Sequence, residues 1–300
     1  MALSDVWRTW RRQIKARMPY VRRREHRVLQ QKYAELIAAA DGQATPATQA
    51  QLHEAQPLNL NLSGEVCFFV SYAAHADLKP HVVVHISRLL DAGFAVVLTV
   101  NTDLPPQSIQ IPTALAQRLS GVLIRENTGF DFAAWAHTYA LCSARGINAA
   151  QWTRLLMVND SIVPSSNQTH FSDMLERLRA SPAALIGLTE SLMPQRHLQS
   201  YFLVLNQQAL GNAFVQRRLQ GVLNFPTKSQ VIDVYETRWP GLLRAQGLSC
   251  EALFPALSSD PLSSDDTSLR WAELMQRGFP YIKTRVLDKL SSAERIRLGL

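Results

Sequence analysis

RENTGFDFAAW at residues 125–135 and LLMVNDS at residues 155–161 are the two stretches that decide how this chain folds. The first passes through a glycine into a segment with helical spacing. The second is an apolar run that ends in the polar tip Asn159-Asp160-Ser161. Apolar strands that end in polar residues about 30 positions apart are typical of an open α/β sheet, which builds its site along the carboxyl edge. The pair predicts that a nucleotide-linked substrate meets an acidic group at this edge.

Short apolar runs alternate with segments of helical spacing through most of the chain. The runs expected to be strands are 65–72, 94–101, 121–126, 153–160, 183–189 and 198–205. The segments expected to be helices are 78–92, 111–120, 130–144, 169–180, 207–219, 228–246 and 266–278. Strands that are apolar on both faces are typical of a buried, mostly parallel sheet. The alternation predicts a Rossmann-like α/β domain over residues 63–290, with a mostly parallel sheet and flanking helices.

The positive charge of the chain is concentrated at its start. Residues 1–32 hold ten Lys or Arg against two acidic residues, whereas the rest of the chain holds 21 against 22. A body without excess basic charge argues against nucleic-acid binding. Trp7, Trp10, Ile14 and Met18 recur at intervals of three and four, which predicts a basic amphipathic helical arm within residues 1–40. This arm either lies on an anionic membrane surface or packs on its own domain with a solvated basic face.

Other features of the sequence concern its segments and its compartment. Residues 41–62 are polar and turn-rich, which predicts a linker. The three cysteines lie far apart without metal-ligand spacing, as expected in a reducing compartment. The start lacks the apolar core of a secretory signal, and no run approaches the roughly 18 apolar residues of a membrane span. We therefore expect a cytoplasmic protein, peripheral at the inner face of the cell membrane if the arm binds lipid.

The polar residues at the strand ends are the candidate site. They are Ser71, Tyr72, Asn101, Asp103, Arg125, Asn127, Gly129, Asp131, Asn159, Asp160 and Ser161. Gly129 lacks a Cβ and can let the backbone approach a ligand closely. Asp131 either contacts a ligand or caps the helix that follows. Arg125 either pairs with a phosphate or forms a salt bridge to Glu126 or Asp131.

Asp160 closes a strongly apolar strand, where a carboxylate is costly to bury without a partner. Hard divalent cations seek such oxygen ligands, and Mg²⁺ needs only one or two protein carboxylates when phosphates supply the rest. The alternative is a turn in which the Asn-Asp-Ser side chains cap backbone groups. The chain has neither a P-loop nor a G-x-G-x-x-G motif, so ATP hydrolysis and dinucleotide binding lack their usual signatures.

Four motifs in this sequence together resemble the rhamnan synthesis protein F family of bacterial polysaccharide assembly. They are RENTGFDFAAW, LLMVNDSIVP, HLQSYFLVL and SLRWAELMQRGFPYIK, and the similarity covers about residues 65–288. The resemblance implies a glycosyltransferase of the A-type fold. Such an enzyme transfers rhamnose or a similar deoxysugar from a nucleotide-diphosphate donor to a growing glycan or lipid-linked glycan. The strand-end residues Ser71, Tyr72, Asn101, Arg125, Asn127, Gly129, Asp131 and Asn159 are then the donor contacts.

The match to broader A-type transferases has one departure. Asn127-Thr128-Gly129 and Asn159-Asp160-Ser161 occupy the places of their N-x-G element and D-x-D motif. One carboxylate therefore stands where two are usual. Asp160 is still the expected ligand for Mg²⁺ or Mn²⁺, but the requirement for a metal stays open.

An inverting transfer needs one base to deprotonate the acceptor hydroxyl. Glu236 is the first choice for this base, and Asp265 or Asp266 is the second. The alternative for Glu236 is a surface or ion-paired carboxylate. A cation at Asp160, or Arg125 in its absence, would stabilise the departing diphosphate.

The acceptor or sugar contacts are expected on the strand 198–205 and near the chain end. They are His197, Gln199, Ser200 and Asp266. On a continuous strand His197 and Gln199 share one face and Ser200 points the other way. His197 can complete a metal site or be structural. A second hypothesis for the whole chain is a non-catalytic assembly protein that keeps the transferase fold.

Overall fold

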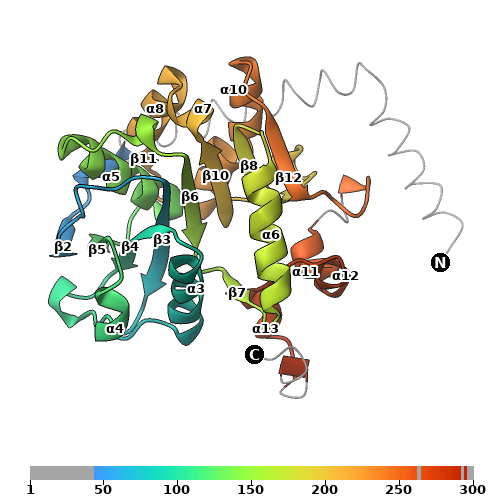
Figure 1. The fold of residues 1–300 in the computed structure, drawn as a ribbon, viewed down its shortest axis with the longest axis horizontal. Helices are drawn as coiled ribbons and strands as arrows, with labels where there is room; N and C mark the ends of the chain where they lie inside the picture. Colours follow the sequence, from blue (N-terminus) through green and yellow to red (C-terminus); the bar gives the residue numbers. More distant parts are fainter. Residues whose placement is uncertain (1–43, 262–264, 292–293, 296–300) are drawn as a thin grey trace, which may run out of the picture. The chain divides into compact units, whose positions relative to one another are not determined.

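The computed structural model describes residues 44–261, 265–291 and 294–295 (Figure 1). The chain divides into residues 1–44 and 45–300, and the α/β fold lies in the second part. The helical arm expected over residues 1–40 and its membrane-binding face lie outside the described residues.

A nine-stranded sheet forms the centre of the fold. Its main path has the order β12-β8-β10-β6-β3-β4-β5-β2, and β9 pairs with β8. The strands of this sheet are β2 (Leu52–Gln56), β3 (Glu65–Ala73), β4 (Ala95–Thr102), β5 (Gly121–Glu126), β6 (Arg154–Asn159), β8 (Leu185–Ser191), β9 (His197–Leu198), β10 (Phe202–Asn206) and β12 (Cys250–Phe254). Two small antiparallel pairs join β1 (Thr45–Pro46) to β11 (Leu223–Asn224) and β7 (Ile162–Pro164) to β13 (Tyr281–Lys283).

The α/β class is confirmed, but the expectation of a mostly parallel sheet is wrong, because the sheet is mixed. Strands β6, β3, β4 and β5 are parallel to their neighbours in this group, and β12 is parallel to β8. Strand β10 is antiparallel to both β6 and β8. The connection 192–201 between β8 and β10 is too short for a parallel crossover, which takes about a dozen residues or more. The four parallel strands still place their carboxyl ends at one edge.

Part of the segment expected to be a linker belongs to the sheet. Strand β2 pairs antiparallel with β5 and covers the edge of the parallel group. Its residues alternate between half-buried and exposed, as is common for an antiparallel strand with one solvated face. Within the segment expected to be a linker, residues 52–56 are therefore an edge strand.

Helices cover both faces of the sheet. They are α3 (Pro80–Asp91), α4 (Thr113–Ala116), α5 (Phe130–Ala144), α6 (Gln168–Ala180), α7 (Gln207–Leu210), α8 (Ala213–Gln220), α9 (Lys228–Val231), α10 (Trp239–Ala245), α11 (Asp266–Leu269), α12 (Trp271–Gln276) and α13 (Thr284–Leu287). Helices α3 and α6 lie on the same face of the sheet (Figure 1). Their apolar side chains share one core cluster with alternate residues of β3 and β4. Helix α5 packs against the sheet as well, and Trp135 Nε1 donates to the Phe68 carbonyl oxygen at 3.1 Å. Strand β3 is thus buried on both faces, as its uninterrupted apolar sequence predicts.

The strand expected over residues 198–205 is broken in two. Strand β9 ends at Leu198 and β10 begins at Phe202. Both Gln199 and Tyr201 bond to the Thr189 hydroxyl of the neighbouring strand. The pairing with β8 shifts from Glu190↔Leu198 in β9 to Gly187↔Leu203 in β10, so residues 199–202 oppose only residues 188–189 and the chain bulges there. The expected alternation of His197, Gln199 and Ser200 along one strand is wrong for this reason.

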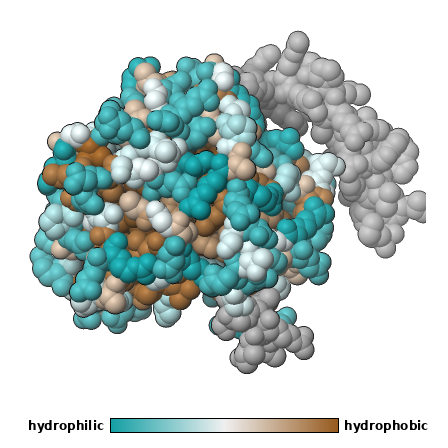
Figure 2. Space-filling model, viewed as in Figure 1, coloured by the Kyte–Doolittle hydropathy of each residue, from teal (hydrophilic) through white to brown (hydrophobic). Residues whose placement is uncertain are grey.

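Large hydrophobic side chains are sparse on the surface formed by the described residues. Figure 2 shows hydrophilic residues surrounding small hydrophobic patches on the face in view. Within the described residues, the exposed large hydrophobic side chains are Leu60, Tyr72, Val84, Met193 and Leu269. The described helices include none that is both long enough and apolar enough to cross a membrane.

Candidate active site

Asp160 lies in the turn between β6 and β7, at the carboxyl edge of the parallel strands. Its Oδ2 accepts hydrogen bonds from Ser71 Oγ at 2.9 Å and from the Tyr72 backbone N–H at 3.1 Å. The Lys79 ammonium lies 2.6 Å from the same oxygen. His81 Nε2 donates to the Asp160 carbonyl oxygen at 3.0 Å, because a carbonyl oxygen can only accept. This carboxylate therefore has the cationic partner that offsets its desolvation.

Asn159 connects this turn to the start of α5. Asn159 Nδ2 donates to Asp131 Oδ2 at 2.7 Å, and Asn159 Oδ1 accepts from the backbone N–H and the hydroxyl of Ser161. Burial raises the pKa of Asp131 to about 6, and the neighbouring charges of Asp160 and Glu236 also raise it. Asp131 lies inside the first turn of α5, and its side-chain partner is Asn159. Three carboxylates from three separate elements thus lie close enough to influence one another.

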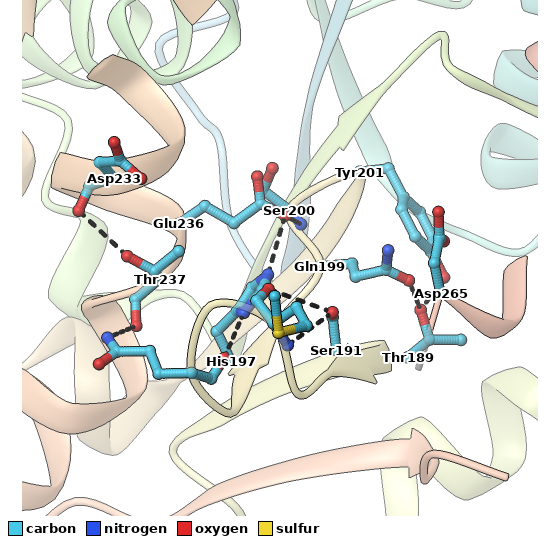
Figure 3. A network of polar contacts seen from close by, with 12 residues as sticks. Thr189, Ser191, His197, Gln199, Ser200, Tyr201, Asp233, Glu236, Thr237 and Asp265 are labelled. Carbon is cyan, nitrogen blue, oxygen red and sulfur yellow. Dashed lines mark hydrogen bonds and ion pairs between the residues drawn. The ribbon is translucent and has the colours of Figure 1, made fainter. Parts of the chain in front are cut away.

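Glu236 ends a π-helical turn, Ile232–Glu236, and its side chain lies beside the break between β9 and β10 (Figure 3). Glu236 Oε1 accepts from the Ser200 backbone N–H at 3.1 Å and lies 3.7 Å from His197 Nε2. His197 Nδ1 donates to the Gln195 carbonyl oxygen at 2.8 Å, which leaves Nε2 facing Glu236. Single π turns are rare in proteins, and those that do occur are often found at functional sites. The structure thus brings together three residues singled out from the sequence: Glu236, His197 and Ser200.

Gln199 and Asp266 lie within the packed interior instead. Gln199 Oε1 accepts from Thr189 Oγ1 at 2.6 Å and from Thr267 Oγ1 at 3.3 Å. Asp266 Oδ2 accepts from the Leu257 backbone N–H at 2.6 Å. Both side chains are buried. Their contacts hold the start of α11 against the sheet.

Asp265 is engaged by two cations. Lys283 Nζ lies 3.9 Å from Asp265 Oδ1, and Arg285 forms an ion pair with the other carboxylate oxygen. Burial acts to raise the pKa of Asp265, but Lys283 and Arg285 outweigh it and hold this pKa below its ordinary value. A carboxylate stabilised in this way is a weak base, so Glu236 is the better candidate of the two.

Arg125 faces the protein interior and not the edge of the sheet. Its side chain is fully buried. Its guanidinium donates to the carbonyl oxygens of Ala47 and Thr128 and to Asn224 Oδ1, at 3.2, 2.5 and 2.6 Å. Its Nε donates to His137 Nδ1 at 3.4 Å. These contacts leave Arg125 as the residue that holds the loop after β5, so the structure supports neither the phosphate contact nor the salt bridges to Glu126 or Asp131.

Gly129 is required by packing within the chain. Its φ is 70°, in the left-handed region. A Cβ added to Gly129 would lie 2.5 Å from Asn224 Oδ1 and 2.5 Å from the Ala133 side chain. The backbone close to Gly129 is therefore that of Asn224, which also accepts from Arg125. The expected close approach of a ligand to Gly129 is replaced by this contact.

We expect Gly129→Ala to lower the free energy of unfolding by about 2–4 kcal/mol, from the left-handed φ and the clash together. The matched control is Gly146→Ala, because Gly146 has φ 77° and a Cβ at this position would meet nothing within 4 Å. The control should cost only the conformational part, about 1–2 kcal/mol. Urea unfolding of both variants measures the difference, and equal losses would mean that the contact with Asn224 is unimportant.

The remaining strand-end residues surround Asp103. Asp103 Oδ2 accepts from the Tyr72 hydroxyl at 3.2 Å and from Asn127 Nδ2 at 3.1 Å. Asn101 is buried, and its Oδ1 has no hydrogen-bond partner among the described residues. A buried acceptor without a partner is costly and invites a donor from a ligand or water. A cavity of about 380 Å³ adjoins this group and is lined in part by Thr102, Asp103 and Glu126.

Sequence reasoning missed Lys79, His81 and Lys283. Lys79 and His81 flank the proline that begins α3, so they reach Asp160 from a helix start and not from a strand end. Lys283 comes from β13, whose pairing with β7 places it beside Asp265. Lys283 ends the SLRWAELMQRGFPYIK motif of the family resemblance, in which it had no expected role. The sequence marks Lys283 only by its place directly after the residues Phe279-Pro280-Tyr281-Ile282.

The donor atoms around Asp160 do not fit a divalent cation held by the protein. Asp160 Oδ2 already faces the Lys79 ammonium and two N–H or O–H donors. Asn159 Oδ1 is engaged by Ser161. His197, the other expected ligand, faces Glu236. Across the described ranges, no group of three or more His, Cys, Asp or Glu side chains is arranged to hold a metal.

The raised pKa of Asp131 gives a pH dependence with a definite sign. Between the ordinary value of 3.8 and about 6, the folded carboxyl holds a proton that the unfolded chain releases. Asp131 therefore stabilises the fold less as the pH rises through this window, by about 2–3 kcal/mol in total. We expect Asp131→Asn to abolish this contribution, since an amide keeps an acceptor for Asn159. Urea unfolding of both proteins at pH 4 and pH 7 measures this contribution. If the free energy of unfolding changes equally between the two pH values in the wild type and in Asp131→Asn, Asp131 is not its source.

Comparison with known proteins identifies relatives of the chain. A family model described as "Rhamnan synthesis protein F" matches residues 96–298. Two Vibrio anguillarum proteins described as virulence protein VirA, one of them from strain 775, are each 25% identical to this chain over 220 residues. The alignment covers 61% of this chain and 67% of each relative. The resemblance carried by the four sequence motifs is confirmed.

Proposed function

We propose that this chain, which belongs to the rhamnan synthesis protein F family, transfers a sugar from a nucleotide-diphosphate donor to a growing cell-surface polysaccharide. The family description links its members to rhamnan synthesis. A deoxysugar such as rhamnose is the donor sugar that this description favours. The acceptor is then a glycan or a lipid-linked glycan.

One observation carries the proposal: Asp131, Asp160 and Glu236 converge at the carboxyl edge of the parallel strands. They come from α5, the β6–β7 turn and the π turn, which are distant in sequence. Asn159, which directly precedes Asp160, links them: its side chain donates to Asp131, and its backbone N–H donates to the carbonyl oxygen of Tyr201, beside the Ser200 N–H that Glu236 accepts. Assembling three carboxylates costs free energy through their mutual repulsion, so such a cluster is more common at a functional site than in packing.

Glu236 takes the role of the general base. Its carboxylate is only partly exposed, and its Oε1 is oriented by the Ser200 N–H. His197 Nε2 lies 3.7 Å from the same oxygen. Glu236 would take the proton of the acceptor hydroxyl as that oxygen attacks the anomeric carbon, and the diphosphate would leave from the opposite side with inversion.

The donor side lies around Asn101, Tyr72 and Asn127. The Asn101 Oδ1 without a partner supports a contact from a donor N–H or O–H in this region. Tyr72 is exposed and provides an aromatic face. Arg125 and Gly129 shape the loop that carries Asn127, so they support the donor pocket without touching the donor.

The basic arm would place the enzyme near its acceptor. Residues 1–32 carry a net charge of +8 from ten basic and two acidic residues. An anionic membrane surface attracts such a segment. In this proposal the arm holds the protein at the inner face of the membrane, where lipid-linked glycans are extended.

A donor screen tests the function. Thermal shift and titration calorimetry of the whole chain against dTDP-, UDP- and GDP-linked hexoses and deoxyhexoses should reveal one class of donor that binds. Transfer is then measured with that donor and an isolated lipid-linked glycan. Donor binding with neither transfer nor donor hydrolysis would favour the non-catalytic assembly protein. If no nucleotide sugar binds, the proposal is wrong.

A further inference from the structure

The leaving group of the proposed reaction requires a cation close to Asp160. A nucleoside diphosphate gains negative charge as the glycosidic bond breaks, and that charge must be stabilised in the transition state. Arg125, the alternative expected from the sequence, is buried and bonded within the fold. Among the described residues no group of three or more His, Cys, Asp or Glu side chains is arranged to hold a divalent cation, and Asp160 Oδ2 is already paired with Lys79. The residue that occupies the cation's place is Lys79.

Lys79 is held at this place by its side chain and by its backbone. The ammonium lies 2.6 Å from Asp160 Oδ2, and the same oxygen accepts from Ser71 and Tyr72. Lys79 directly precedes Pro80, the first residue of α3, and its carbonyl oxygen accepts from the Val82 N–H at 3.0 Å. The carboxylate thus acts on a lysine whose backbone is already constrained by a helix start.

A second bond ties the start of α3 to the same turn. His81 Nε2 donates to the Asp160 carbonyl oxygen at 3.0 Å. Two contacts therefore join the turn to the helix start, and the Lys79 ammonium already lies beside the turn. Cations that are oriented before the reaction stabilise developing charge without a reorganisation cost.

The Lys79 ammonium still has the capacity to bind an anion. Its side chain is 43% exposed, whereas that of Asp160 is 15% exposed. An ammonium has three N–H donors, and the contact with Asp160 uses one. The ammonium also lies 5.9 Å from the centre of the exposed Tyr72 ring, at the mouth of the donor side. The side chain of Lys283, by contrast, is only 13% exposed beside Asp265.

We propose that Lys79, positioned by Asp160, supplies the positive charge that binds the donor diphosphate, so that donor binding does not require a divalent cation. This inference rests on the proposed glycosyltransferase function and names the cation that the function needs. Asp160 is then a positioning residue for Lys79.

Calorimetry with the free nucleoside diphosphate of the donor class tests the inference on the whole chain. The wild type should bind this probe in EDTA, and added Mn²⁺ should change its affinity by less than about threefold. Lys79→Met should weaken binding of the diphosphate by about tenfold or more, with little effect on the corresponding nucleoside. Lys79→Arg should stay within about fivefold of the wild type, because it keeps the charge. Lys289→Met, at an exposed lysine, is the matched control and should match the wild type.

Asp160→Asn separates the two roles of Asp160. If Asp160 positions Lys79, this variant should bind the probe in EDTA more weakly than the wild type but better than Lys79→Met. If the wild type loses binding of the probe in EDTA and regains it with Mn²⁺, the inference is overturned and the proposed function stays intact. Unchanged binding by Lys79→Met would overturn it as well. If the wild type binds no nucleoside diphosphate with or without metal, the proposed function itself fails.

Discussion

Glu236→Gln is expected to reduce sugar transfer by about 10²–10⁴-fold while nucleoside-diphosphate binding stays close to that of the wild type. Glutamine keeps an oxygen that accepts from the Ser200 N–H, so the local structure should persist. It cannot take a proton from the acceptor hydroxyl. The measurement is the initial rate of transfer at saturating donor, together with calorimetry of donor binding. Loss of transfer without loss of binding is the signature of a base.

Glu273→Gln is the matched control for this prediction. Glu273 lies on α12, is 44% exposed and pairs with Arg277 at 3.2 Å. Exposed ion pairs contribute little to stability, so this variant should transfer sugar at the rate of the wild type. Transfer by Glu236→Gln at more than about a tenth of the wild-type rate would rule out Glu236 as the base. Asp265 would then be the next residue to test.

Arg125→Met is expected to lower the free energy of unfolding by about 3–5 kcal/mol. The guanidinium satisfies buried oxygens of Ala47, Thr128 and Asn224. Methionine fills part of the volume but leaves these acceptors without donors. Burial lowers the pKa of Arg125 to about 10, so Arg125 remains charged at neutral pH, and its hydrogen bonds are charge-assisted. Urea denaturation with an unchanged m value measures the loss.

Arg118→Met is the control for Arg125. Arg118 pairs with Asp91 at 2.6 Å, but both side chains are well exposed. Its replacement should change the free energy of unfolding by less than about 1 kcal/mol. An Arg125→Met protein with near wild-type stability but without donor binding would contradict the structural role. That outcome would instead support the hypothesis from the sequence that Arg125 binds a phosphate.

The ends of the parallel strands were predictable from the sequence for a local reason. An apolar run buried on both faces of a sheet must stop where a polar residue meets solvent or a ligand. Val158 and Asn159 mark such a stop, and so do Val100 and Asn101. Because parallel strands share one carboxyl edge, the strand assignments alone predicted that Asn101 and Asn159 lie at the same edge of the sheet. The resemblance to A-type transferases extended this to Glu236, on the helix expected after the sheet, and the structure brings Glu236 to His197 and Ser200.

The roles of Arg125 and Gly129 could not be predicted in the same way. Both depend on Asn224, which lies 99 residues from Arg125 in sequence. Neither strand periodicity nor turn chemistry carries information about such a partner. Lys79 was missed for a related reason, since it reaches Asp160 from a helix start 81 residues earlier. A residue's local pattern says whether it is polar at a strand end, but not which distant group it meets.

By itself, the sequence determined the α/β class, most of the strands and helices, and the edge at which the polar residues gather, because burial and periodicity are properties of short segments. The family followed from the four sequence motifs. The tertiary structure alone decided the antiparallel placement of β10 and β2, the break at Gln199–Tyr201 and the partners of each charge. Those features depend on which segments meet across the sheet, and their free energies come from contacts between residues far apart in the chain. The acidic strand end at Asp160 was therefore evident from LLMVNDS, whereas its lysine partner was evident only once the chain had folded.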